Sequence, residues 1–307
     1  MSRIAILTKS CKYFAAPFLA KALGADLYTM DHTQDTFFGG GDNVRTYENR
    51  KIDCEHLIVI GTRALLAIKN HISSYKSVAV VFSDTNCCIL RDAWLPLVKR
   101  YGVTVYAMPD LFQYCTCEKY PIYQTMTLPK MDTTKTEGPV TILHSPGKKA
   151  QHKGTREIMA VVNLLKQTHD IKLKILTKET WFGCLREKAG AHIFIDQLVY
   201  KNRFVKQSRF GGKIPYLGAL GKSGLEAMLL GCCTVTGSPV PDVRPYYAIP
   251  PVIFTDVERA YNDLEMLITN PETRQQYAEK QREWAEYYLS PAFMASHITR
   301  HIKSETV

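Results

Sequence analysis

The fold of this chain is decided by Tyr216-Leu-Gly-Ala-Leu-Gly-Lys-Ser-Gly-Leu-Glu-Ala-Met-Leu-Leu-Gly231, which follows Ile195-Asp196-Gln197 after an intervening basic segment. A glycine-rich turn leads here into an apolar helix that carries one carboxylate, Glu226. The backbone N–H groups and the positive end of such a helix face outward, where they can hold an anion. The stretch therefore outlines a nucleotide site.

Short apolar runs alternate with helical patterns before this stretch. Strands that are apolar throughout and separated by helices indicate a parallel sheet covered on both faces. The first half predicts strands at 3–7, 57–60, 78–82 and 103–108, and helices at 14–23, 63–70, 90–100 and near Leu111.

A polar segment with prolines near both ends, residues 127–139, is the natural linker to a second alternating series. That series predicts strands at 140–143, 171–176, 192–195, 233–236 and 252–255, and helices at 154–167, 179–189 and 223–230, followed by a helical tail over 257–302. The chain is therefore expected to be an α/β protein with two Rossmann-like domains. We place them at 1–130 and 131–290, and residues 291–307 form a terminal helix that is a candidate to pack back on the first domain.

The composition of the chain is typical of a soluble globular protein. The chain has 307 residues, 46% hydrophobic and 22% charged, and no apolar run long enough to span a bilayer. Its N-terminal apolar run is too short for a signal peptide. Nine cysteines, an odd number, favour free thiols in a reducing cytoplasm, and Cys115-Thr-Cys117 lacks the spacing of a zinc site.

The net charge of +10 favours polyanionic partners such as nucleic acid, anionic lipid or nucleotide phosphates, and simple solubility is the alternative.

Candidate ligand-binding residues gather in the second half, because ligands of open parallel sheets bind beyond the carboxyl ends of the strands. Those ends carry His144 and the following Gly147, Lys148, Lys149 and Lys153, then Asp196 and Gln197, and then the turn before Glu226. Lysines there can neutralise a diphosphate. The alternatives are an exposed loop for the lysines, a structural role for His144 and a capping role for Asp196.

These motifs resemble the donor-binding half of retaining GT-B glycosyltransferases of the family-4 type. The resemblance rests on His144-Ser-Pro146, Lys153-Gly-Thr155, Asp196-Gln197 and the run from Gly218 to Gly231, and it covers about 139–240. It implies two domains facing across a cleft, with the acceptor bound by the first and a UDP- or GDP-sugar by the second.

The resemblance also implies roles for single residues. Glu226 would grip the ribose hydroxyls, Lys149 and Lys153 the diphosphate, and Ser223 and Gly224 would offer N–H groups to phosphate. An acidic residue of the family's motif is replaced here by Gly218. No metal is then required, because lysines supply the charge, and the departing phosphate accepts the acceptor's proton. The full set of expected donor-binding residues is His144, Gly147, Lys148, Asp196, Gln197, Gly221, Lys222, Ser223, Gly224 and Glu226.

For Glu226 the alternative is a solvated carboxylate in the first turn of its helix. If it instead binds donor, Glu226→Ala should weaken donor binding with little loss of stability.

The acceptor is expected at the end of another strand, 78–82, where Ser83, Asp84 and Thr85 follow. Asp84 could bind an acceptor hydroxyl or steady developing charge on the sugar, so it joins Lys149 and Lys153 as a candidate catalytic residue. An N-cap role competes for Asp84. Residues 37–43 form a glycine-rich loop that either closes over an acceptor or is a plain surface loop.

Aromatic and basic residues interleave between 200 and 213, with Lys201, Arg203 and Arg209 as candidate acceptor contacts. Such a segment can bind the phosphate backbone and unstacked bases of a nucleic acid, or it can be an amphipathic edge that contacts an anionic membrane. The third alternative is an ordinary solvated face. The short basic chain resembles phage DNA glycosyltransferases, which implies a hydroxymethylated base as acceptor and the host cytoplasm as location. The alternatives are a polysaccharide or lipid acceptor at the membrane, and a noncatalytic nucleic-acid-binding module.

Overall fold

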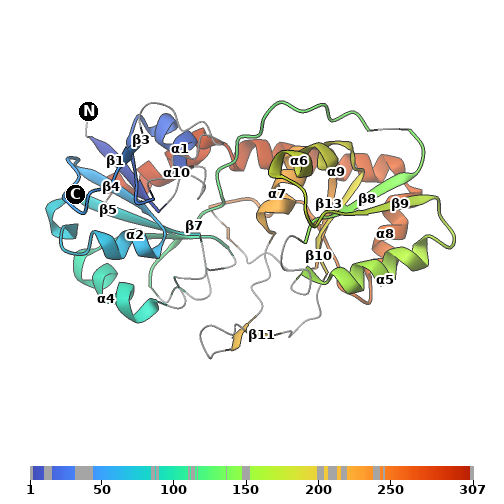
Figure 1. The fold of residues 1–307 in the computed structure, drawn as a ribbon, viewed down its shortest axis with the longest axis horizontal. Helices are drawn as coiled ribbons and strands as arrows, with labels where there is room; N and C mark the ends of the chain where they lie inside the picture. The colour runs from blue at the N-terminus through green and yellow to red at the C-terminus, as the bar shows by residue number, and fades with distance from the viewer. Residues whose placement is uncertain are drawn as a thin grey trace. The chain divides into compact units, whose positions relative to one another are not determined.

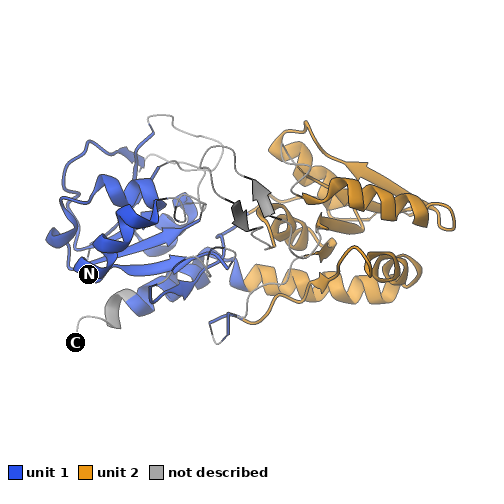
Figure 2. Ribbon diagram, turned by 90° about the horizontal axis from the view of Figure 1, so that it is seen from below, with its two compact units in different colours: residues 1–127, 243–247, 288–307 blue, residues 128–242, 248–287 orange. Residues whose placement is uncertain are grey.

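A computed structural model of the chain describes residues 3–9, 16–31, 44–83, 87, 90–109, 111, 115, 117–135, 137–146, 153–198, 204–206, 213–215, 220–237, 243–244 and 246–304. The chain forms two compact units (Figure 2). Unit 1 comprises 1–127, 243–247 and 288–307, and unit 2 comprises 128–242 and 248–287. The chain passes from unit 1 into unit 2 at the start of the polar segment 127–139.

Unit 1 is built on a seven-stranded parallel sheet in the order β3-β2-β1-β4-β5-β6-β7. The central strand β4 is buried along its whole length and its neighbour β5 at every residue but the first, which explains why their sequences are apolar runs rather than alternating patterns. The strands are β1 (Ile4–Thr8), β2 (Asp26–Thr29), β3 (Val44–Thr46), β4 (His56–Ile60), β5 (Ser77–Phe82), β6 (Thr104–Ala107) and β7 (Tyr120–Pro121).

Helices cover both faces of this sheet (Figure 1). The strand order reverses at β1 and β4, and right-handed crossovers in opposite directions put the connecting helices on opposite faces. One face carries α1 (Ala16–Leu23) and the C-terminal α10 (Pro291–Ser304), which pack together; the other carries α2 (Thr62–Ala67) and α4 (Arg91–Tyr101). A short 3-10 helix, η3 (Ile72–Ser74), precedes β5. The Tyr106 hydroxyl donates to Ile298 O at 3.1 Å and fixes α10 to unit 1.

Unit 2 is built on a five-stranded parallel sheet in the order β14-β13-β10-β8-β9. The strands are β8 (Val140–His144), β9 (Ile171–Ile175), β10 (Ile193–Gln197), β13 (Cys233–Thr236) and β14 (Ile253–Phe254). A separate antiparallel pair, β11 (Phe204–Lys206) and β12 (Lys213–Pro215), lies within the basic segment of the sequence.

Two buried clusters of apolar residues join the helices of unit 2 to its sheet. Ile158 and Val162 of α5 share one core with Leu264 of α8. Ala227 of α7 belongs to a second core with Phe194 of β10. The helices are α5 (Thr155–Leu165), α6 (Trp181–Gly190), α7 (Lys222–Leu229), α8 (Ala260–Thr269) and α9 (Pro271–Tyr288).

The predicted alternation of strands and helices is confirmed, and so is the α/β class with two parallel-sheet domains and a helical C-terminal end. Strands β2, β3 and β7 were not predicted from the sequence. These are short strands toward the edges of the sheet, and β3 is largely exposed, so no apolar run marks them.

Candidate functional site

The candidate site lies where the unit 2 strands end. β8 ends at His144, β10 at Gln197 and β13 at Thr236, and these three strands are neighbours in the sheet. Their parallel pairing brings the carboxyl ends to one edge, which is the edge where open α/β sheets bind ligands. Helix α7 begins there with Gly221 as its N-cap.

Asp196 links two of these segments from a fully buried position. Its Oδ1 accepts a hydrogen bond from Lys153 Nζ at 2.6 Å, and its Oδ2 accepts one from the Gly221 N–H at 2.9 Å. Lys153 keeps 22% of its side-chain surface exposed. The carboxylate therefore holds a partly exposed ammonium group beside the first turn of α7, whose leading N–H groups have no partner within the helix.

Two glycines make this close approach possible. A Cβ on Gly224 would lie 2.7 Å from Leu220 Cδ1 and 3.3 Å from the side chain of Asp196. A Cβ on Gly221 would lie 3.0 Å from Lys153 Nζ. The N–H of Gly224 donates to Gly221 O at 2.9 Å, so it is used inside the turn and is not offered to a phosphate as the sequence analysis expected. The absence of a side chain at these two glycines therefore allows α7 to pack directly on Asp196.

Glu226 lies in the second turn of α7 and is only 4% exposed. Its Oε2 pairs with Lys188 Nζ at 2.5 Å, its Oε1 accepts from Trp181 Nε1 at 2.8 Å, and Lys222 Nζ lies 3.9 Å from the same oxygen. The alternative of a solvated first-turn carboxylate is therefore wrong. A carboxylate has about four acceptor positions, so two remain beside those that Lys188 and Trp181 use.

His144 is fully buried and both ring nitrogens have partners. Nδ1 donates to Ile195 O at 2.8 Å, which leaves Nε2 to accept from the Thr155 hydroxyl at 2.9 Å. Burial is the main cause that lowers the pKa of His144 to about 4. The ring links β8, β10 and α5 as a neutral group, which favours the structural alternative over direct contact with a donor.

Two hydroxyl groups at strand ends lack a hydrogen-bond partner among the described residues. Thr236 Oγ1 is buried at the end of β13, in unit 2, next to Gln197, which is itself 3% exposed. Ser83 Oγ is buried just beyond β5 in unit 1. Buried polar atoms are nearly always hydrogen-bonded in native proteins, so each group suggests a partner that is not part of the described chain.

Several expected site residues lie outside the residues that the structure describes: Gly147, Lys148, Lys149, Asp84, Thr85, Lys201, Arg203, Arg209, the glycine-rich loop 37–43 and Gly218. Of the remaining expected residues, the structure brings Lys153, Asp196 and Gly221 together, with Gly224 packed against Asp196.

Lys188 and Trp181 were not predicted as site residues from the sequence. Both lie on α6, 38 and 45 residues before Glu226, and the indole ring also has Lys222 Nζ 5.8 Å from its centroid. The one available signal was that Lys188 falls on the buried face of the predicted helix 179–189, where an unpaired lysine is costly.

Within the described ranges, no cluster of His, Cys, Asp or Glu has the grouping that would hold a metal ion. The seven described cysteines are free thiols, and burial raises the pKa of Cys233 to about 12. None of the helices that the structure describes is both long enough and apolar enough to cross a bilayer.

No protein-family model and no curated protein sequence matches this chain. Among solved structures, it is similar to HepE of Anabaena in complex with UDP-glucose, with 11% identity, a TM-score of 0.66, and 99% of this chain and 100% of HepE covered. It is also similar to the sucrose-phosphate synthase of Thermosynechococcus elongatus, with 9% identity, a TM-score of 0.61, and 99% of both chains covered. BGT of phage T4 in complex with its UDP-glucose substrate has 11% identity and a TM-score of 0.52, with 98% of this chain and 99% of BGT covered. At these identities the likeness shows the fold, which is GT-B.

Proposed function

We propose that this GT-B chain is a glycosyltransferase that moves a sugar from a uridine-diphosphate donor to an acceptor hydroxyl. The observation that carries the proposal is the Lys153–Asp196–Gly221 link at the carboxyl edge of unit 2. It fixes a cation at the start of a helix, and both features attract a phosphate group. HepE and phage T4 BGT, which were both solved in complex with UDP-glucose, favour uridine over guanosine.

The donor diphosphate would lie against Lys153 and the first turn of α7, with Ser223 N–H and the Lys222 ammonium group beside it. Lys149 is proposed as the second diphosphate lysine. Because Asp196 neutralises part of the charge on Lys153, the helix end and further lysines would provide the rest of the attraction. Thr236 Oγ1, which has no partner in the described part of the chain, is a candidate donor or acceptor toward the bound molecule.

Glu226 is proposed to accept the ribose hydroxyls with the two acceptor positions that remain on its carboxylate. Lys188 and Trp181 are then positioning residues, since each holds one oxygen of Glu226 in a fixed direction. Lys188 also places its positive charge 2.5 Å from the buried carboxylate oxygen.

We propose retention of anomeric configuration. The bond between the anomeric carbon and the phosphate oxygen breaks, the acceptor oxygen bonds to that carbon on the same face, and the departing phosphate oxygen takes the acceptor's proton. Cations and N–H groups around the diphosphate stabilise its growing charge, which lowers the barrier.

The acceptor is proposed to be a hydroxymethylated base in DNA, bound by unit 1 near Ser83 and Asp84 and by the basic segment that holds Lys201, Arg203 and Arg209. The net charge of +10 supports a polyanionic acceptor. The Ser83 hydroxyl, which lacks a partner within the described residues, supports a polar group arriving at the end of β5.

Binding of UDP tests the donor site, measured by calorimetry on the full chain. The double variant Lys153→Met with Asp196→Asn removes both charges of the buried pair, so its stability should stay near that of the wild type while its Kd for UDP rises about tenfold or more. Lys172→Met removes an exposed lysine from β9 and is the matched control, with an unchanged Kd. Equal Kd values for all three proteins would refute the site.

Transfer tests the reaction itself. A panel of nucleoside-diphosphate sugars is incubated with hydroxymethylated DNA and with a neutral glycan, and the products are examined by mass spectrometry and by NMR of the anomeric proton. Transfer to DNA should fall steeply with added salt, because each phosphate contact that the protein makes releases counterions from the DNA, and added salt opposes this release. DNA binding without turnover of any donor would favour the noncatalytic module, and an inverted product would refute retention.

A further inference from the structure

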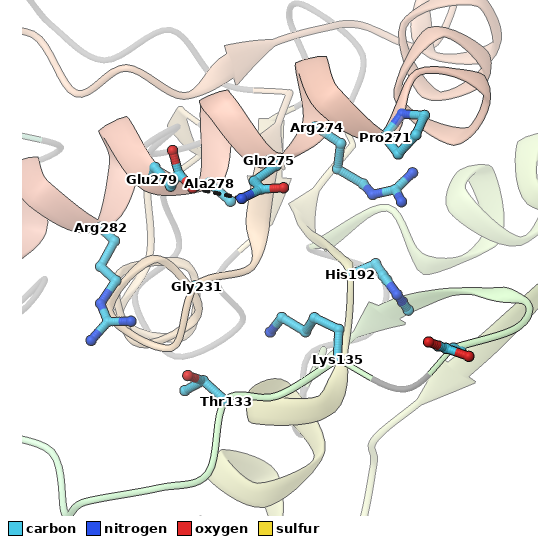
Figure 3. Close-up of a pocket in the computed structure, with 11 residues that line it drawn as sticks. Thr133, Lys135, His192, Gly231, Pro271, Arg274, Gln275, Ala278, Glu279 and Arg282 are labelled. Atoms are coloured by element: carbon cyan, nitrogen blue, oxygen red, sulfur yellow. Dashed lines mark hydrogen bonds between the residues drawn. The ribbon is translucent and has the colours of Figure 1, made fainter.

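A cavity of about 520 Å³ opens on unit 2 (Figure 3). The residues of its wall place it at the edge of the sheet opposite the site proposed above. Its wall includes Glu137, His192 and Gly231, which come just before β8, β10 and β13. Residues of α9 between Pro271 and Arg282 line the other side. The cavity therefore lies at the amino ends of the strands, and its volume falls in the range of small-molecule sites.

Hydrogen-bond donors line the inner part of this cavity. Lys135 Nζ donates to Ala189 O and Leu230 O, at the ends of α6 and α7. One of the three N–H bonds of its ammonium group is therefore available to donate to a ligand. Arg274 NH1 donates to Leu267 O and Ile268 O, at the end of α8. The other side of the guanidinium group is therefore available to donate to a ligand.

His192 completes this set of donors. Its Nδ1 accepts the Thr141 N–H at 3.1 Å, so the proton of the neutral ring is on Nε2, which can donate. Arg274 reaches from α9 toward His192, and Lys135 lies beside them (Figure 3).

The electrostatics of these three groups favour a negative guest. Burial lowers the pKa of Lys135 and of Arg274. Burial lowers the pKa of His192 as well, with Arg274 and Lys135 adding to the effect through their positive charges. No carboxylate pairs with Lys135 or Arg274 among the described residues. The two acids of the wall, Glu137 and Glu279, are exposed at its rim.

We propose that this cavity binds a phosphorylated, hydroxyl-bearing small molecule, with the phosphoryl group on Lys135, Arg274 and His192 and the hydroxyl groups toward Glu137 and Glu279. A lone phosphate would fill only a small part of the volume, and carboxylates at the rim accept hydrogen bonds from hydroxyl groups. The positive end of α9, which begins at Pro271 in the wall, adds attraction for the phosphoryl group.

Calorimetry tests this second site in the full chain carrying Lys153→Met and Asp196→Asn, the double variant that removes both charges of the proposed donor-site pair. UDP cannot serve to block the donor site alone, because UDP is itself phosphorylated and bears hydroxyl groups. Glucose 6-phosphate and pyrophosphate are the probes, titrated at constant ionic strength, and both should bind. Arg274→Gln should raise the Kd for either probe about tenfold, and His192→Asn about threefold. Arg186→Gln removes an exposed arginine from α6, outside the cavity wall, and should leave the Kd unchanged.

Arg274 also holds the end of α8, so the melting temperature of each variant is measured without ligand. His192→Asn keeps an acceptor for the Thr141 N–H and is the variant expected to retain the fold. Absence of binding by both probes at millimolar concentration overturns the proposal, and so does a Kd that His192→Asn leaves unchanged. UDP binding by the wild type is measured separately, so failure of the donor site and failure of this site are told apart.

Discussion

The buried ion pair between Lys188 and Glu226 gives the sharpest prediction of stability. Their side chains are 1% and 5% exposed and their charged atoms lie 2.5 Å apart. Removing one member of such a pair leaves an uncompensated buried charge, which typically costs about 3–5 kcal/mol. Lys188→Met and Glu226→Gln should each lower the free energy of unfolding by that amount, a large share of the roughly 5–15 kcal/mol that stabilises a domain.

The double variant separates the pairing from the loss of each side chain. Lys188→Met with Glu226→Gln leaves no buried charge, and the glutamine can still accept the Trp181 N–H. The double variant should therefore lose no more stability than either single variant, so the coupling free energy is at least about 3 kcal/mol. Urea unfolding followed by circular dichroism and tryptophan fluorescence measures all four proteins.

An exposed pair in the same unit is the matched control. Arg282 Nε and Glu286 Oε1 lie 2.7 Å apart on α9, with side chains about half exposed, and such pairs couple by only about 0.3–0.5 kcal/mol. A coupling below about 1 kcal/mol for Lys188 and Glu226 would refute the reasoning. The expectation that Glu226→Ala leaves stability almost unchanged is revised, because it assumed a carboxylate without a buried partner.

Three further predictions concern unit 2. Gly154→Ala should lower the melting temperature much more than Gly231→Ala. Both glycines have a positive φ, which costs an L-residue roughly 1–2 kcal/mol. Of the two, only Gly154 also lacks space for a Cβ, which would lie 1.6 Å from Leu198 O. Equal melting temperatures would contradict this. Gln281→Leu should lower the free energy of unfolding in urea by at least about 2 kcal/mol, because the buried amide hydrogen-bonds both the N–H and the C=O of Thr234. The exposed Gln276→Leu is the control and should change that free energy by at most about 0.5 kcal/mol. Similar losses for the two variants would show that the hydrogen bonds of the Gln281 amide contribute little to stability. The pKa of His144 is lowered to about 4, so the unfolded state holds more protons between pH 4 and 6.5; stability should fall as the pH drops through this window, by about 3 kcal/mol from this residue. His144→Asn should flatten that fall, and an unchanged pH profile would rule the assignment out.

The order of strands and helices could be predicted from the sequence because each signal is local. Residues 193–195 are apolar, Asp196 and Gln197 follow them, and helical patterns come before and after this run. This pattern predicts a buried parallel strand, as the structure has it. The glycine-rich turn before α7 marked the edge of the sheet where the candidate site lies. Short edge strands such as β3 carry no such pattern, and pairing with neighbours alone makes them strands.

The chemistry of single residues was decided by tertiary structure. The sequence places Glu226 on a helix, but only the packing of α6 against α7 sets Lys188 and Trp181 on its two oxygens. Likewise, the link from Asp196 to Lys153 and Gly221 joins segments 43 and 25 residues away. Periodicity and propensity act over a few residues and determine the elements of the fold. Burial, ion pairing and the acceptors left on a carboxylate depend on groups that are distant in sequence, and these meet only when the sheet and its helices have assembled.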